Sequence, residues 1–155
     1  MSTVLPRLIH SSPTFAGHQT FTLRAGWLKK GLDALQDEEC GGGEVFARPD
    51  ALITLGVGKN MVESIRHWLL VTGMAQEEDG ARRRRLQPTE LGRAMLGSPG
   101  TSSGWDPFIE DVATLWLLHW ELAKPRNIAV TWVWTFSAFH EYEFTKVSLA
   151  EMIRH

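Results

Sequence analysis

The sequence predicts a mainly α fold, in which a winged helix-turn-helix with a small β-hairpin wing is followed by a tryptophan-rich helical subdomain. Three observations support this prediction. Apolar residues recur at helical spacing over 26–36 and again over 59–71. The pair Asp79-Gly80 marks a tight hairpin turn, because both central residues of such a turn favour positive φ. Most of the seven tryptophans lie in the last third of the chain, where the pattern becomes largely apolar.

The totals for the whole chain exclude several classes of protein. With a net charge of −2, the 155-residue chain is not uniformly basic, so any electrostatic attraction to DNA must come from local clusters of charge. Cys40 is the only cysteine, which excludes an internal disulfide and, with no signal peptide visible, favours the cytoplasm. His119, Glu121 and Pro125 interrupt the longest apolar stretches, so neither a membrane span nor a membrane partner is predicted.

The predicted elements follow one another closely in the first 97 residues. Pro49 suits the first turn of a short helix, and Thr89 is a good N-cap for another. The first helix has an apolar face made of Trp27, Leu28, Leu32 and Leu35. The predicted order is a helix over 26–36, a flexible glycine-rich loop over 37–44, a short helix over 49–55, a turn at 56–58, a helix over 59–71, hairpin strands over 74–78 and 81–87, and a helix over 90–96.

The helix over 59–71 is predicted to have two distinct faces. Met61, Ile65, Trp68 and Leu69 recur at helical spacing and form the buried face. The solvent-facing side is predicted to carry Lys59, Asn60, Glu63, Ser64 and His67.

The stretch over 97–104 is rich in Gly, Ser and Pro and is typical of a linker. It predicts a boundary between a winged-helix domain with an N-terminal arm over 1–97 and a helical subdomain over 105–155. Helices are predicted over 108–123, over 128–139, and from an N-cap at Thr145 to the last residue. A helical pattern that runs to the final residue favours a chain that is part of a longer protein.

Basic residues predict contacts to double-stranded DNA from three places. A recognition helix in the major groove, a charged wing on the backbone and a basic cluster near the N-terminus are the expected contact surfaces. The predicted DNA-binding residues are Arg24, Lys29, Lys30, Lys59, Asn60, Ser64, Arg66, His67, Arg82, Arg83, Arg84 and Arg85. Two competing interpretations remain open. The wing arginines can instead pair with the acidic residues at 77–79, and winged helices also serve as protein-interaction modules.

Two smaller clusters are candidates for phosphate chemistry. His18 and Thr20, beside Gly17, can bind a backbone phosphate or its sulfur-bearing counterpart, although a buried histidine that satisfies backbone groups is an equal alternative. Asp106, Glu110 and Asp111 are weak catalytic candidates, since paired carboxylates can hold Mg²⁺ for phosphodiester hydrolysis. Acidic residues at a helix N-terminus are more commonly caps. No His or Cys spacing matches a zinc site, so no metal site is predicted.

Four blocks of sequence resemble the signature of one bacterial family. The blocks are GHQTF at 17–21 with LRAGWL at 23–28, LGVGKNMV at 55–62 with IRHWL at 65–69, DPFIED at 106–111 with ATLWLLHW at 113–120, and FT at 144–145. This family was long labelled as of unknown function, and its genes lie beside DNA phosphorothioation and phage-defence genes of the Ssp and Dnd type. The resemblance implies a part in placing sulfur in the DNA backbone, or in a defence that depends on it, and a longer protein that nicks DNA.

Together, these patterns and the resemblance predict a DNA-binding component of a phosphorothioation and phage-defence system. Its partners would be double-stranded DNA and other proteins of that system. Mg²⁺ is a cofactor only if the protein is a nuclease. An assembly module for sulfur-transfer or ATPase partners and a winged-helix transcription regulator are competing hypotheses. The tryptophans after residue 100 can stack on unpaired bases, but such a stripe is more often core packing.

Overall fold

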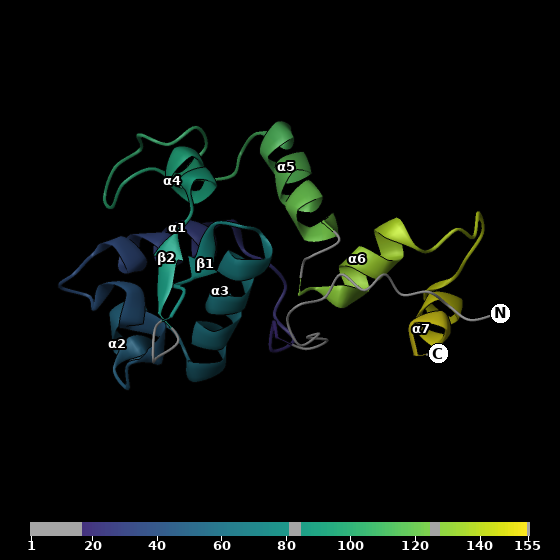
Figure 1. Cartoon of the computed structure of the whole chain (residues 1–155), viewed down its shortest axis with the longest axis horizontal. Helices are drawn as coiled ribbons and strands as arrows, with labels where there is room; N and C mark the ends of the chain where they lie inside the picture. The colour runs from purple at the N-terminus through teal and green to yellow at the C-terminus, as the bar shows by residue number, and fades with distance from the viewer. Residues whose placement is uncertain (1–16, 81–84, 125–127, 155) are drawn as a thin grey trace.

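The computed structural model describes residues 17–80, 85–124 and 128–154. It is mainly helical with one small antiparallel sheet, which confirms the mainly α prediction (Figure 1). The elements in chain order are α1 (Ala25–Gln36), the 3-10 helix η1 (Gly42–Ala47), α2 (Ala51–Leu55), α3 (Lys59–Val71), β1 (Ala75–Glu77), β2 (Leu86–Pro88), α4 (Glu90–Leu96), α5 (Val112–Ala123), α6 (Val130–Ser137) and α7 (Lys146–Arg154).

Helices α1 and α3 pack against each other at the centre of the core. Leu28 and Leu32 on α1 meet Ile65 and Leu69 on α3, and all four side chains are fully buried. Gly31 allows the close approach, because a Cβ at that position would lie 2.7 Å from Ile65 Cγ2. The apolar face predicted for α1 is therefore confirmed.

The hairpin and α4 close one side of this core. β1 and β2 are antiparallel, with Ala75 opposite Pro88 and Glu77 opposite Leu86. The predicted N-cap of α4 is confirmed, because Thr89 Oγ1 accepts a hydrogen bond from the Gly92 N–H at 3.0 Å. The same hydroxyl donates to the Gly73 carbonyl at 2.6 Å and so ties α4 to the end of α3.

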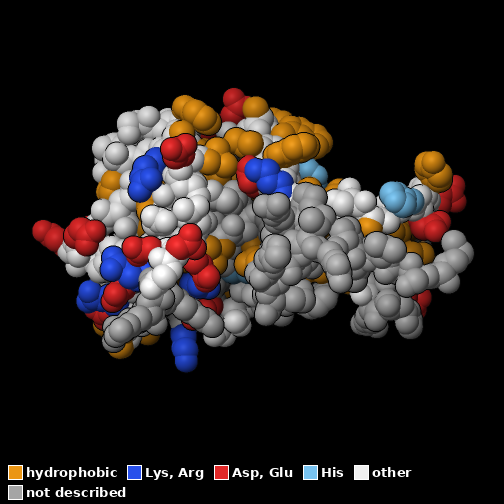
Figure 2. All heavy atoms as spheres, in the orientation of Figure 1, with side chains coloured by type: hydrophobic (Ala, Val, Ile, Leu, Met, Phe, Trp, Pro, Cys, Tyr) orange, Lys and Arg blue, Asp and Glu red, His pale blue; other side chains and the backbone are white. Residues whose placement is uncertain are grey.

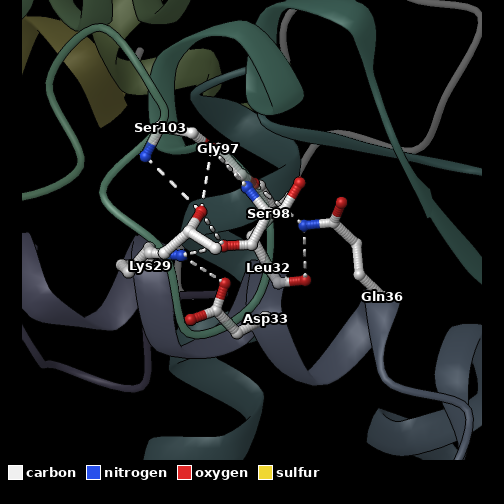
Figure 3. A network of polar contacts seen from close by, with 8 residues as sticks. Lys29, Leu32, Asp33, Gln36, Gly97, Ser98 and Ser103 are labelled. Atoms are coloured by element: carbon white, nitrogen blue, oxygen red, sulfur yellow. Dashed lines mark hydrogen bonds and ion pairs between the residues drawn. The ribbon is translucent and has the colours of Figure 1, made fainter.

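Residues 97–104, predicted to be a linker, are hydrogen-bonded to α1 (Figure 3). Lys29 Nζ donates to Asp33 Oδ1 at 2.6 Å and to the Ser98 carbonyl at 2.8 Å. Gln36 Nε2 donates to the Gly97 carbonyl at 3.2 Å. The chain then returns to α4, where the Trp105 N–H donates to the Ala94 carbonyl. The path from α4 towards α5 is thus held in place by specific contacts.

Several predicted elements begin or end elsewhere, and α1 and β1 differ from their predicted ranges by only one residue at an end. The last residues of the loop expected over 37–44 belong to the 3-10 helix η1, which begins at Gly42. The helix expected over 49–55 begins at Ala51, and the helix expected over 128–139 is the shorter α6. The helix predicted from residue 108 begins only at Val112, because Ile109 has a φ of 57° and interrupts the helical path. The helix expected after Thr145 is α7, and Thr145 Oγ1 accepts a hydrogen bond from the Ser148 N–H at 3.1 Å.

The three C-terminal helices extend from the body formed by α1–α4. Figure 1 shows α5 next to the body and α6 and α7 progressively farther from it. Leu118 and Leu122 of α5 are buried in the same apolar cluster as α1 and α3. Within the described residues, none of the helices combines the length and apolar character needed to cross a bilayer.

Candidate functional site

The first turn of α3 is the most accessible part of the predicted recognition helix. Lys59, Asn60 and Glu63 are exposed, as expected. They follow the short helix α2 directly, through Gly56, whose φ of 61° ends α2 in a left-handed conformation. The sharp change of direction between α2 and α3 therefore depends on this glycine, and it leaves the N-terminus of α3 facing solvent.

Farther along α3, the expected exposure of two residues was wrong. Ser64 is fully buried and His67 is only 8% exposed. Ser64 lies one turn before Trp68 on the apolar stripe, so it enters the interior with that stripe. His67 is covered because the segment before α1 crosses it, with the His18 and His67 rings 6.1 Å apart between centroids. Neither side chain lies on an open helix face.

Two arginines near the hairpin, Arg66 and Arg85, are paired with acidic side chains of that hairpin. Arg66 Nη2 donates to Glu77 Oε1 at 2.7 Å, and the Arg66 side chain is only 15% exposed. Arg85 Nε lies 3.1 Å from Glu78 Oε2 at the surface. Arg82, Arg83 and Arg84 lie outside the described residues. Figure 2 shows acidic and basic side chains mixed around the hairpin, so the described part of this surface is not uniformly cationic.

The cations of the N-terminal cluster also contact their own chain. The Arg24 guanidinium lies 5.0 Å from the centre of the Trp27 ring. Lys29 bridges α1 to the Ser98 carbonyl, and Lys30 Nζ donates to the Leu55 carbonyl at 3.1 Å. Arg24 and Lys30 are exposed, whereas Lys29 is largely covered. Lys29 and Lys30 therefore help to hold the fold together, while Arg24 and Lys30 also remain exposed to solvent.

The acidic candidates bind backbone groups. Asp106 Oδ1 accepts from the Glu110 N–H at 3.0 Å and Oδ2 accepts from the Asp111 N–H at 2.9 Å. These N–H groups hold the pKa of the Asp106 carboxyl below its usual range. Asp111 caps α5 through the Ala113 N–H at 2.8 Å. Over the described residues, no group of three or more His, Cys, Asp or Glu side chains is placed to hold a metal ion.

A pocket of about 610 Å³ lies between the segment before α1 and helices α3, α5 and α6. Its lining includes His18 from the segment before α1, His67 and Trp68 from α3, His119 from α5 and Trp132 from α6. His18 and Thr20 were predicted as a phosphate or sulfur site, and both line this pocket. Thr20 and its neighbour Gln19 have φ values of 66° and 51°, which non-glycine residues rarely adopt.

Two tryptophan N–H groups stabilise the walls of this pocket. Trp68 Nε1 donates to the Phe21 carbonyl at 3.2 Å and fixes residues 17–24 against α3. Trp132 Nε1 donates to His119 Nδ1 at 3.2 Å and joins α6 to α5.

Burial is the main cause that lowers the pKa of His67 to about 4, with His18 and Arg66 adding to the effect. His67 is therefore uncharged at neutral pH.

Comparisons with known proteins give one family and two solved structures. The family described as "Protein of unknown function (DUF4007)" matches residues 15–155. The structure titled "Magnesium ion-bound SspB crystal structure" is 34% identical, with a TM-score of 0.81, and the match covers 98% of this chain and 44% of that one. The structure titled "SspB crystal structure" is also 34% identical, with a TM-score of 0.80, over 96% of this chain and 43% of that one. This chain thus spans less than half of either SspB chain. None of the curated protein sequences matches it.

Proposed function

This chain belongs to the family described as Protein of unknown function (DUF4007), and from this membership we propose that it is a DNA-binding component of a bacterial DNA phosphorothioation and phage-defence system. The similarity to SspB supports the assignment to such a system. Its partners in the cell are then double-stranded DNA and other proteins of the same system.

The observation that carries DNA binding is the solvent-facing first turn of α3, which follows α2 through a tight turn. In this proposal, α2 and α3 are the two helices of a helix-turn-helix, and β1 and β2 are the wing. Lys59 and Asn60 are exposed there. A helix N-terminus attracts phosphate through its partial positive charge and unpaired N–H groups, and Lys and Asn side chains bind phosphates and base edges.

In this proposal, the exposure of each predicted side chain decides whether it contacts DNA directly. Lys59, Asn60, Arg24 and Lys30 are accessible. Arg85 is also available, because a surface ion pair such as that with Glu78 is weak and a phosphate can compete for the guanidinium. Arg66 holds Glu77 from a largely covered position, so its main effect is to orient the hairpin. Ser64 and His67 make no direct contact in this proposal, because both are buried.

The test is duplex binding at several salt concentrations with two matched lysine variants. Lys59→Ala removes an exposed cation at the start of α3. Lys124→Ala removes one at the end of α5, where its ion-pair partner Glu121 packs beside Gly73, past the C-terminal end of α3. We expect Lys59→Ala to weaken binding and to lower the salt slope by about 1, and Lys124→Ala to change neither. Equal effects of the two variants would contradict a contact centred on α3.

Recognition of a sulfur-modified DNA backbone can be tested in the same binding assay. Duplexes of identical sequence, with and without a phosphorothioate, separate general DNA binding from recognition of the modification. Tighter binding of the modified duplex, lost in a variant of His18 or Thr20, would assign sulfur recognition to the segment before α1. Equal affinity for both duplexes would restrict the proposal to DNA binding.

A second candidate function, an assembly module, is favoured by the exposed apolar side chains of α5. Trp116 and Trp120 are 68% and 66% exposed, and Figure 2 shows hydrophobic side chains gathered over α4 and α5. Such a patch is typical of a protein interface. Co-elution with purified sulfur-transfer or ATPase proteins of the system, lost in Trp116→Asp and retained in Lys59→Ala, would support this function.

A further inference from the structure

We propose that the pocket between residues 17–24 and helices α3, α5 and α6 binds a flat, uncharged heteroaromatic ring of the nucleobase type. The ring would lie among aromatic and aliphatic side chains, with hydrogen bonds to its edge from histidine and threonine side chains. This inference does not depend on duplex binding, because a free nucleoside carries the same ring.

The size and shape of the pocket fit such a ligand. Its volume of about 610 Å³ falls within the range of about 300–1,000 Å³ that is typical of small-molecule sites. Trp68 of α3 and Trp132 of α6 both line the pocket, together with the apolar side chains of Leu118 and Leu122 from α5. Indole rings bind the faces of nucleobases because every base offers a flat π surface.

The electrostatics favour an uncharged ligand. Among the described residues that line the pocket, none is Asp, Glu, Lys or Arg. His67 adds no charge, because its pKa of about 4 keeps the imidazole neutral at physiological pH. A phosphate or carboxylate placed inside would lose its hydration without gaining a fixed countercharge from these side chains. The charged part of a nucleotide would therefore remain outside.

The polar atoms favour a heteroaromatic ring over a purely apolar group. His18 lines the pocket, and its buried Nδ1 has no hydrogen-bond partner within the described residues. Thr20, Thr22 and Thr131 add hydroxyl groups to the lining. An alkyl chain would leave the buried His18 Nδ1 unsatisfied, which is costly for a buried polar atom, whereas the three threonines are exposed and offer further hydrogen bonds at the pocket mouth. A nucleobase has several donors and acceptors around its edge, whereas the side chains of Phe, Tyr and Trp carry at most one polar atom.

The experiment measures ligand-observed saturation-transfer NMR with the four deoxynucleosides and the intact chain. N-acetylphenylalanine amide and 1-octanol serve as probes for an aromatic side chain and an alkyl chain. We expect at least one nucleoside to bind with a millimolar or lower dissociation constant, and more tightly than either comparison probe. Failure of all four nucleosides to bind, or tighter binding of either comparison probe, would overturn the proposal.

Three variants locate the site. Thr131→Trp places a bulky ring at an exposed lining position and should weaken nucleoside binding at least tenfold. Trp132→Leu keeps an apolar wall but removes its aromatic surface and should weaken binding severalfold. Trp105→Ala, at an exposed tryptophan that is not part of the lining, should leave binding unchanged. Circular dichroism and thermal unfolding check that each variant is folded. Binding that is the same in Thr131→Trp and Trp132→Leu as in the unmodified chain would place the nucleoside elsewhere and reject this pocket.

Discussion

The ionisation of His67 is coupled to folding, because burial lowers the pKa of its imidazole. Its pKa is about 4 in the folded chain and 6.5 in the reference state, so the unfolded chain binds more protons between these values. The free energy of unfolding should therefore be fully retained above pH 6.5 and fall as the pH drops towards 4. We expect a loss of about 1–2 kcal/mol between pH 7 and pH 5, measured by urea denaturation.

The variant His67→Gln tests this assignment, because glutamine does not titrate. The loss of stability between pH 7 and pH 5 should become smaller in His67→Gln. His140→Gln is the control, since His140 is exposed and its replacement should leave the pH profile unchanged. An identical pH profile in His67→Gln and the unmodified chain would mean that another group carries the effect.

At the level of helices and strands, the stability of the fold depends on how closely neighbouring backbone segments approach each other. Gly92 on α4 has no room for a side chain, because a Cβ there would lie 2.1 Å from the Met74 carbonyl oxygen. We expect Gly92→Ala to lower the free energy of unfolding by about 2–3 kcal/mol, measured by chemical denaturation. Gly26 on α1 has no neighbour within 4 Å of an added Cβ. Gly26→Ala should therefore be neutral or stabilising by up to about 1 kcal/mol. Similar losses in both variants would contradict the packing of α4 on Met74.

The connection between α4 and α5 gives a prediction about Lys29. In Lys29→Ala, the bonds from Lys29 to Asp33 and Ser98 are lost, so residues 98–105 should open more often. Hydrogen exchange at the Thr101 and Trp105 amides should become faster, while exchange in α3 stays unchanged. Lys30→Ala is the matched control, because Lys30 bonds to Leu55 instead. Weaker DNA binding in Lys29→Ala without faster exchange would instead make Lys29 a DNA contact.

Most of the regular elements could be predicted because their signals are local. The helical period of α1 and α3, the capping hydroxyl of Thr89 and the turn glycine Gly56 each act within a few residues. The start of α5 could not be predicted, because the Asp106 carboxylate turns the chain by binding the Glu110 and Asp111 N–H groups. That geometry follows from side-chain hydrogen bonds rather than from periodicity.

At the scale of the whole molecule, the candidate site was harder to predict than the fold. Lys59 and Asn60 are exposed, as the polar face of α3 indicated. The burial of His67 could not be predicted, because the segment around His18 that covers it lies far away in the sequence. The pocket could not be predicted for the same reason, since Trp132 and Leu118 come together with His18 and His67 only through tertiary packing. The division of the chain at 97–104 into two domains stays a prediction.

The nuclease hypothesis can also be tested on the whole molecule. The Asp106 and Asp111 carboxylates are already bound to backbone N–H groups, and Glu110 is exposed beside them. We therefore expect any nicking of supercoiled plasmid with Mg²⁺ to persist in Asp106→Asn and Glu110→Gln. Asp106→Asn should instead lower the melting temperature, because an amide can accept with only one of its two polar atoms. Selective loss of nicking, with an unchanged melting temperature, would show that these carboxylates are catalytic.

The hydrogen bond between the Trp68 indole and the Phe21 carbonyl affects how this protein can be shortened. Residues 17–24 include neither a helix nor a strand, and a fragment designed from regular elements alone would begin at Ala25. Such a fragment would keep the helical signal in circular dichroism, yet it would lose the acceptor of a largely buried indole N–H and uncover the flank of α3. The smallest fragment that preserves the native arrangement therefore starts before the first regular element.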